Sequence, residues 1–292
     1  MKLIVSAVCL ALAALVATEE VPRIALPTAV DYHRHIGIPK AAAIKKWEEE
    51  NAEKLRNNER IVGGSIVDIS QAPYQAGLVL TINWLWQSVC GGSLISSTRV
   101  VTAAHCLRYQ TSIATSVTVV LGSNTLFSGG TRITTTNTVL HPNWQDRTLE
   151  NDIAVIRISS VSFSNTIQTI ALASGSESYA GWQGFASGYG LTSDGGNIPN
   201  SQRLSGVTLP IITQTECRNF YQSWHRDTNI CTSGAGRRGT CQGDSGGPLI
   251  VTSNNVRLLV GATSFGSWNG CQAGDPAVYA RISSFRSWIL AQ

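Results

Sequence analysis

The stretch TCQGDSGGPL, residues 240–249, places one serine, Ser245, among glycines, with Asp244 directly before it. Glycine adopts backbone conformations that other residues resist, so the chain can bend tightly on both sides of this serine. Such a bend exposes a hydroxyl and directs neighbouring N–H groups towards one point, as a nucleophile with an oxyanion hole requires. The alternative is a surface turn, because Gly, Ser, Asp and Pro are common in turns.

The overall composition is that of a globular protein with a rather neutral surface. The chain has 292 residues, enough for one large core or two small ones, with 43% hydrophobic and 14% charged residues. The formal net charge is only +4, and no basic run is present. We therefore expect no nucleic acid among its partners.

The first 17 residues, MKLIVSAVCLALAALVA, consist of a lysine, an apolar run and small residues. The run is too short for a membrane span, so we predict a secretory signal peptide (1–17) cleaved near Ala17. No second apolar segment of spanning length follows, and we expect an exported, soluble protein with no membrane partner.

The cysteines agree with export. Of seven, Cys9 lies in the predicted signal, which leaves six. They are Cys90, Cys106, Cys217, Cys231, Cys241 and Cys271. An even number in an exported chain indicates three disulfides, with 15 connectivities open. No CxxC or HxxxH spacing supports a zinc site, and we expect no metal and no cofactor.

Composition changes near residue 60. Residues 40–60 are charged and rich in helix formers. Beyond them come short runs rich in Val, Ile and Thr between Gly, Ser and Asn turns: GLVLTI, SVTVVLG, TRITTTNTVL, DIAVIRI and RLLVGATSF. This pattern predicts an all-β antiparallel barrel or sandwich. The final SSFRSWILAQ predicts a short closing helix.

Lysine and arginine are divided at the same place. Up to residue 60 there are five Lys and four Arg, whereas after it there are 13 Arg and no Lys. One hypothesis is an alkaline environment, because Lys loses its charge near pH ~10.4 and Arg does not. The alternatives are a digestive enzyme that avoids lysine in the presence of trypsin-like proteases, and simple compositional bias.

The junction reads NNER-IVGG, and a trypsin-like protease would cut it between Arg60 and Ile61. The cut would free an amino group on Ile61, beside glycines that allow it to turn inward. We therefore predict three parts: the signal 1–17, an activation pro-segment 18–60 and a catalytic domain 61–292.

Two further stretches decide the meaning of Ser245. VVTAAHC ends a predicted strand with His105, and ENDIAVIRI places Asp152 just before a buried run, where an acid needs a partner. Together with GDSGGP and IVGG, in this order, these motifs resemble the chymotrypsin-like serine proteases over all of 61–292. The resemblance implies two six-stranded antiparallel Greek-key barrels with the active site in the cleft between them.

The roles of the site residues are those the family implies. Ser245 is expected as the nucleophile, His105 as the general base and then acid, and Asp152 as the group that orients the imidazole. The N–H groups of Gly243 and Ser245 would form the oxyanion hole, and Ser264 would hydrogen-bond Asp152.

The resemblance also implies an activation switch and a disulfide pairing. Asp244 would pair with the freed amine of Ile61. The disulfides would be Cys90–Cys106, Cys217–Cys231 and Cys241–Cys271.

The substrate pocket implied by the resemblance is deep and neutral. Gly239 stands at its base, where a trypsin-like enzyme carries an aspartate, and Gly266 and Ala277 form its walls. Phe265 would stack beside the substrate. We expect cleavage after large apolar or aromatic residues, as in chymotrypsins. The alternative is mixed, collagenase-like specificity, because Asp275 stands on the same loop.

The pro-segment resembles those of larval gut chymotrypsins of moths and butterflies, which implies digestion in the gut lumen and shedding after cleavage. Its predicted helix has two equally supported interpretations, a solvated amphipathic segment without inhibitory role or an inhibitory element. Ser88 stands where some relatives carry a histidine that holds the precursor form, so that clamp is in doubt.

The expected partners follow from the same resemblance. They are protein or peptide substrates, a trypsin-like activating protease and, as a possible class, protein protease inhibitors, with the enzyme a monomer. Two other classes stay open: a non-catalytic homologue that acts by binding, and a protease of a defence or clotting cascade.

Overall fold

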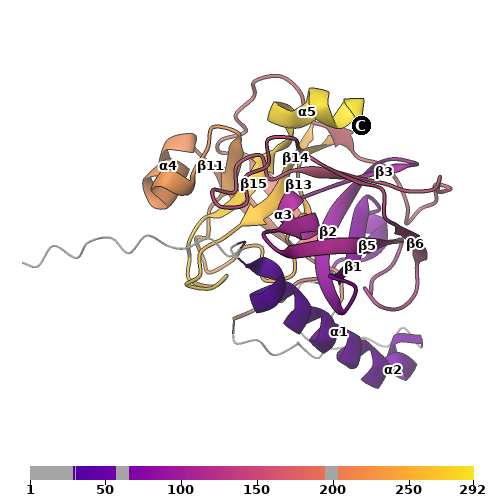
Figure 1. Cartoon of the computed structure of the whole chain (residues 1–292). Coiled ribbons are helices and arrows are strands. Elements are labelled where there is room, and N and C mark those ends of the chain that lie inside the picture. The colour runs from indigo at the N-terminus through magenta and orange to yellow at the C-terminus, as the bar shows by residue number, and fades with distance from the viewer. Residues whose placement is uncertain (1–28, 30, 57–65, 195–202) are drawn as a thin grey trace, which may run out of the picture.

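The computed structural model of the chain describes residues 29, 31–56, 66–194 and 203–292. The predicted signal peptide, Arg60 and Ile61 lie outside the described residues. Figure 1 shows two curved sheets side by side, with helices only at their periphery. Among the described residues, no helix is long and apolar enough to cross a membrane.

The first sheet is formed by residues 75–157. Its strands are β1 (Gln75–Ile82), β2 (Trp86–Ser96), β3 (Arg99–Thr102), β4 (Arg108–Tyr109), β5 (Ser112–Leu121), β6 (Thr131–Thr135), β7 (Thr138–Leu140) and β8 (Ala154–Arg157). They pair in the order β4-β5-β1-β2-β3-β8-β7, and β6 pairs with the other edge of β5. All strand pairs of this sheet are antiparallel among the described residues, where no ladder joins β6 to β7.

The second sheet closes on itself. Its strands are β9 (Ala171–Leu172), β10 (Gln183–Gly188), β11 (Ser205–Ile212), β12 (Asn229–Thr232), β13 (Pro248–Ser253), β14 (Val256–Phe265) and β15 (Ala277–Arg281). The order β13-β10-β11-β12-β15-β14 is completed by a β13–β14 pairing into a six-stranded ring, and β9 adds a short parallel ladder to β14. The prediction of an all-β fold with two antiparallel barrel-like sheets is therefore confirmed. The second is a closed six-stranded barrel, whereas the first, with eight strands among the described residues, is a half-barrel and not the six-stranded barrel expected.

The helices lie outside these sheets. They are η1 (His33–Gly37), α1 (Ile38–Glu50), α2 (Ala52–Arg56), η2 (Ile69–Gln71), α3 (Ala104–Leu107), α4 (Gln214–Tyr221), η3 (Gln222–Trp224) and α5 (Ile282–Ala291). The predicted C-terminal helix is α5, which buries Ile282, Phe285 and Ile289. Helix α4 begins with a capping box in which Thr213 and Glu216 satisfy each other's backbone N–H groups.

Each barrel has its own apolar interior, and a third cluster joins them. Leu78, Val117 and Ile156 are fully buried in the first barrel, and Leu249 and Val260 lie in the second. Burial of such side chains contributes roughly 1.5–3 kcal/mol each, which makes these interiors the main source of stability. The catalytic motifs lie at the ends of strands that these cores fix in position.

The disulfides form with the pairing that the resemblance implied: Cys90–Cys106, Cys217–Cys231 and Cys241–Cys271. They close loops separated by 16, 14 and 30 residues in the sequence. Each stabilises such a domain by about 2–4 kcal/mol, chiefly by restricting the unfolded chain.

Candidate active site

The position of Asp152 follows from the register of two strands. β3 and β8 pair antiparallel with Thr102 opposite Ala154. Continued by two residues, this register would bring Ala104 opposite Asp152. His105, one residue further along and at the start of α3, therefore lies beside the carboxylate. Local strand pairing thus unites two motifs that are 47 residues apart in sequence.

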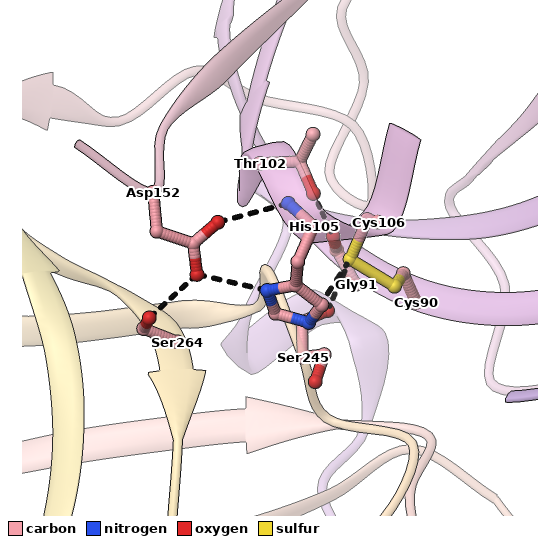
Figure 2. Close-up of polar contacts among 8 residues, drawn as sticks. All are labelled: Cys90, Gly91, Thr102, His105, Cys106, Asp152, Ser245 and Ser264. Carbon is pink, nitrogen blue, oxygen red and sulfur yellow. Dashed lines mark hydrogen bonds and ion pairs between the residues drawn. A yellow bond between two sulfur atoms is a disulfide. The ribbon is translucent and has the colours of Figure 1, made fainter. Parts of the chain in front are cut away.

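Asp152 is buried and its carboxylate is saturated with donors. Its Oδ1 accepts the backbone N–H of His105 at 2.9 Å, and its Oδ2 lies 2.8 Å from His105 Nδ1. The Ser264 hydroxyl donates to the same Oδ2 at 2.5 Å. A buried carboxylate is costly unless it is paired and hydrogen-bonded, and here His105 and Ser264 supply three donors. Figure 2 shows these contacts.

Ser264 is directed at Asp152 by an irregularity in the second barrel. Thr263 pairs with Tyr279 and Phe265 with Val278, so Ser264 is the additional residue of a bulge between them. A bulge locally redirects a side chain that regular alternation would point elsewhere. The hydroxyl of Ser264 therefore leaves the sheet towards a carboxylate of the first barrel.

Ser245 is held between the two barrels by backbone hydrogen bonds. Its carbonyl accepts from Gly91 N of β2 at 2.7 Å, and Gly246 N donates to Thr263 O of β14 at 2.7 Å. At Gly246, φ is +78° and a Cβ atom would lie 2.1 Å from Thr102 Oγ1, so no other residue fits. The glycine after the serine is therefore required because this turn closely approaches β2 and β3.

Figure 2 places Ser245 beside the edge of the His105 ring that faces away from Asp152. Both side chains are buried, His105 at 0% and Ser245 at 8% relative exposure. The order carboxylate, imidazole, hydroxyl is the arrangement in which imidazole can remove a proton from a hydroxyl while the carboxylate stabilises the resulting cation.

Asp244, directly before this serine, places its carboxylate against Gly188 and Gly190, where a larger residue would collide with it. Its carboxylate accepts from Gly190 N at 2.8 Å and Cys241 N at 2.9 Å. A Cβ on Gly188 would lie 2.1 Å from its Oδ1. Burial raises the pKa of Asp244 to about 6, although the two backbone N–H groups oppose the shift. No cation among the described residues pairs with this carboxylate, which borders a cavity of about 300 Å³.

The comparisons with known proteins agree with this geometry. A family profile described as trypsin matches residues 61–289. The chain belongs to the trypsin family of serine proteases.

Similar proteins include Serine protease 1 of Drosophila melanogaster, 38% identical over 240 residues, which are 79% of this chain and 84% of that protein. Trypsin delta of Drosophila erecta is 41% identical over 236 residues, 79% of this chain and 87% of that protein. Among solved structures, an "HL collagenase" superposes with a TM-score of 0.71 at 31% identity, covering 79% of this chain and 97% of that one.

In this protease the expected specificity residues line a single pocket. Gly239, Gly266 and Ala277 all contribute to it, together with Ser245. A Cβ on Gly239 would meet only a backbone oxygen, at 3.5 Å, and one on Gly266 would meet nothing within 4 Å. The base and one wall are therefore open and uncharged.

Two other expected pocket residues have more specific surroundings. Phe265 is 2% exposed and packs edge to face on Tyr221, with ring centroids 5.2 Å apart, so its ring is a buried support of the pocket. Asp275 lines the same pocket as Gly239, and its Oδ2 accepts from Asn269 Nδ2 at 2.9 Å. A carboxylate is thus present at the pocket although its base is neutral.

Sequence reasoning missed Asp194, which fastens a loop to the pocket wall. Its carboxylate accepts from the backbone N–H groups of Cys271 and Gln272, both at 2.9 Å. Gly270 leaves room for it, because a Cβ there would lie 2.5 Å from the carboxylate. No sequence signal distinguishes this aspartate from an ordinary turn residue.

The potential metal ligands are already committed to disulfides. Three clusters of His, Cys or Asp side chains occur among the described residues, and each contains two cysteines of one disulfide. The metal ligand is the thiolate, which a disulfide sulfur is not. These clusters therefore offer no cysteine ligand set.

The pro-segment contributes residues to the site that sequence reasoning did not assign. Tyr32 and Ile36, each 1% exposed, line the same pocket as Gly239 and Ser245. The interpretation of this helix as a solvated segment is wrong, because one of its faces is buried on the protease. The available signal was the spacing of Tyr32, Ile36 and Ile44 at multiples of four, which gives one apolar helix face.

Replacement Ser264→Ala tests the bridge to Asp152. Hydrogen bonds to charged groups contribute about 1.5–3 kcal/mol, so we expect kcat/KM to fall at least about tenfold with the fold retained. Ser93→Ala is the control, because Ser93 is equally buried but its hydroxyl has no partner among the described residues. Equal kcat/KM in both variants would contradict a role for Ser264.

Replacement Asp244→Asn tests the acid that has no cationic partner among the described residues. Because the folded-state pKa is raised from 3.8 to about 6, the folded chain binds this proton more tightly than the unfolded chain. Stability from this group is therefore lost as pH rises from about 4 to about 6, by roughly 3 kcal/mol. Urea unfolding at pH 4 and pH 7 should show this additional loss in wild type and not in the variant. Parallel pH dependences would refute it.

Proposed function

We propose that the chain is a secreted serine endopeptidase, made as a precursor and activated by cleavage between Arg60 and Ile61, that acts in digestion. The observation that carries the proposal is the order Asp152, His105, Ser245 beside a neutral, open pocket. The family supports peptide-bond hydrolysis of protein substrates.

The reaction begins with proton transfer from the Ser245 hydroxyl to His105 Nε2 as the hydroxyl oxygen attacks the substrate carbonyl. Asp152 holds Nδ1 protonated through its 2.8 Å contact and stabilises the imidazolium that forms. His105 then donates its proton to the leaving amine. A water molecule then attacks the acyl-enzyme while His105 accepts its proton. His105, oriented by Asp152, returns that proton to Ser245 as the acid product leaves.

Negative charge on the carbonyl oxygen is stabilised by the N–H groups of Gly243 and Ser245. At Gly243, φ is +104° and a Cβ would lie 2.9 Å from Gly190 Cα, which supports a backbone placed here for its N–H group. Loss of one such donor typically costs about 3 kcal/mol of transition-state stabilisation.

Cleavage after Arg60 supplies the cation that Asp244 lacks. The new α-amino group of Ile61 enters the cavity beside Asp244 and forms an ion pair with the carboxylate. A buried acid whose pKa is raised by desolvation gains most from such a partner, because the pairing removes an existing cost. The pairing fixes Gly243 and Ser245, the residues on either side of Asp244.

The pocket supports a preference for large apolar or aromatic side chains. Gly239 offers no counter-charge at the base, and Gly266 and Ala277 leave the slot wide. A digestive setting is supported by the resemblance of the pro-segment to those of insect gut chymotrypsins. A trypsin-like protease is the activator, and the mature enzyme is a monomer.

A second candidate is mixed specificity, which one observation favours. The Asp275 carboxylate lies at the pocket lining and can attract a basic side chain that reaches past Gly239. The similarity to the "HL collagenase" structure supports the same candidate.

Matched peptides ending in Phe or Arg distinguish the two specificities. The precursor is cut after Arg60 and residues 1–60 are separated from the enzyme. We then expect kcat/KM for Phe to exceed that for Arg at least about a hundredfold, because a buried cation without a counter-charge is costly. In Asp275→Asn, cleavage after Arg falls about tenfold further and cleavage after Phe is unchanged.

Asp227→Asn is the control, since that aspartate is exposed and pairs with Arg218 away from the pocket. Mixed specificity would be established if the wild type cleaves after Phe and Arg at comparable rates and Asp275→Asn abolishes cleavage after Arg. Absence of turnover with every peptide, together with an intact fold, would favour the non-catalytic homologue.

A further inference from the structure

Residues 31–56 of the predicted pro-segment are folded and lie against the catalytic domain. Figure 1 shows α1 and α2 as a rod along the first barrel, at the opposite end of the molecule from α5. Both η1 and α1 contact β2, the strand that contains Cys90 and Gly91. One face of the rod is buried, including Ala41, Ile44 and Trp47.

We propose that residues 29–56 are an active-site inhibitor that stays bound without a covalent link after cleavage at Arg60, so that activity requires their release as well. This rests on the proposed protease function. Residues 29–56 cover a surface of the catalytic domain that extends from the catalytic cleft to the loop 123–130.

Tyr32 contacts both groups that carry the reaction. Its hydroxyl donates to Val89 O at 2.8 Å, and its ring meets the His105 imidazole edge to face with centroids 5.0 Å apart. Burial raises the pKa of Tyr32, and the nearby Ser245 side chain partly opposes this shift. Tyr32 and Ser245 line the same pocket, so the phenol lies beside the nucleophile.

The specificity pocket is closed by the same residues. Tyr32 and Ile36 form part of its lining, and the free volume that remains is about 50 Å³. An apolar cavity that holds one benzene molecule measures about 150 Å³. With the pro-segment bound, the pocket therefore has no room for an aromatic side chain.

The segment is bound in a form unlike an extended peptide strand. Tyr32 has φ −48° and ψ −49°, and His35 N donates to Asp31 O at 3.2 Å within the helical turn. Peptides that bind along a sheet edge do so as extended strands. The helical backbone thus places a tyrosine at the pocket without presenting its peptide bond as a substrate would.

Close packing against Ser88 of β2 fixes the position of η1. His33 Nδ1 lies 2.8 Å from Ser88 Oγ, so the pro-segment itself brings a histidine to this serine. A Cβ on Gly37 would lie 2.0 Å from Ser88 Oγ, which only glycine avoids. The approach of η1 to β2 therefore depends on Gly37.

A second anchor lies at the far end of α1. The Glu48 carboxylate accepts from Leu126 N at 2.7 Å, Phe127 N at 3.0 Å and Ser128 Oγ at 2.7 Å. Glu48 is 4% exposed, and a buried carboxylate satisfied by three donors is costly to separate from them. Its neighbour Glu50 is exposed and pairs only with Lys46 among the described residues.

No covalent bond retains the segment once the chain is cut. The six cysteines after residue 60 pair with one another, and the only other cysteine is Cys9. The complex is therefore held by the contacts above alone, and it dissociates on dilution.

The first test uses the full chain with Asn57→Ile, Asn58→Glu and Glu59→Gly, which give the factor Xa site IEGR before Ile61. Factor Xa then cuts after Arg60 and spares the lysines of the pro-segment. We expect this cut chain, without further substitutions, to hydrolyse a Phe peptide weakly at micromolar concentration, with activity per molecule rising on dilution. Full activity at once, with residues 29–56 intact and at every concentration, would overturn the proposal.

Variants of the same chain assign the effect to the contacts. Tyr32→Ala and Glu48→Gln should each raise the dissociation constant at least about thirtyfold, as expected for buried anchor residues. Glu50→Gln is the matched control and should change it less than twofold. Gly37→Ala favours the helix but collides with Ser88, so it should also weaken binding. Equal dissociation constants for Glu48→Gln and Glu50→Gln would refute the second anchor.

Turnover separates this proposal from the proposed function. If every cut variant, Tyr32→Ala included, hydrolyses no peptide although Ile61 is confirmed as the new terminus, the protease function fails. If all variants hydrolyse equally at every dilution, the protease function holds and the inhibitor proposal fails.

Binding should also weaken in acid because His33 is docked as a neutral imidazole. Burial lowers its pKa to about 3, helped by the nearby His105, while the His105 and Cys106 carbonyls oppose the shift. The other polar side chains against it are Ser88 and Tyr32. The released segment gains a proton below pH ~6.5 that the bound segment does not, so affinity falls about tenfold per unit below that pH.

Fluorescence anisotropy of a labelled 29–56 peptide on the cut, separated Ser245→Ala enzyme measures this without turnover. The dissociation constant should be flat from pH 7 to 9 and about tenfold higher at pH 5.5. In a His33→Asn peptide the change should disappear. An unchanged acid response in that peptide would assign it to another group and overturn this part.

Discussion

The carboxylate of Asp152 is the constraint on which the active site depends. It lies in the first barrel, yet one of its donors, Ser264, belongs to the second. A buried charge must be satisfied, and the donors that satisfy it come from both sheets. The bulge at Ser264 and the start of α3 at His105 are therefore fixed by the same group. Movement of one barrel against the other would remove the Ser264 donor from this charge and leave it only the donors of His105.

The residues near the reaction could be predicted because the motifs that carry them are local. Gly243 and Gly246 have positive φ, and their neighbours leave no room for a Cβ atom. The backbone geometry therefore requires these two glycines of GDSGGP. Asp194 and Glu48 could not be predicted in this way. Each carboxylate finds its donors on a loop more than 70 residues away, and nothing in the adjacent sequence indicates that loop.

The pro-segment shows the same limit more clearly. Its helical character could be inferred from composition, and the spacing of Tyr32, Ile36 and Ile44 indicates one apolar face. The surface that this face contacts could not be inferred. The contacts of Tyr32 with His105 and Ser245 arise only from the tertiary fold. In the folded chain Asp244 has no cationic partner among the described residues, and Tyr32 lies beside His105 and Ser245.

The division of lysines acquires a chemical consequence from this architecture. No lysine follows residue 60, whereas Lys45, Lys46 and Lys54 lie on the exposed side of α1 and α2. Once the chain is cut after Arg60 and the helices are gone, the polypeptide from 61 to 292 carries one primary amine, the α-amino group of Ile61. Amine-reactive reagents would therefore label the mature protein at a single atom, whose reactivity reports directly whether that terminus lies in water or inside the protein.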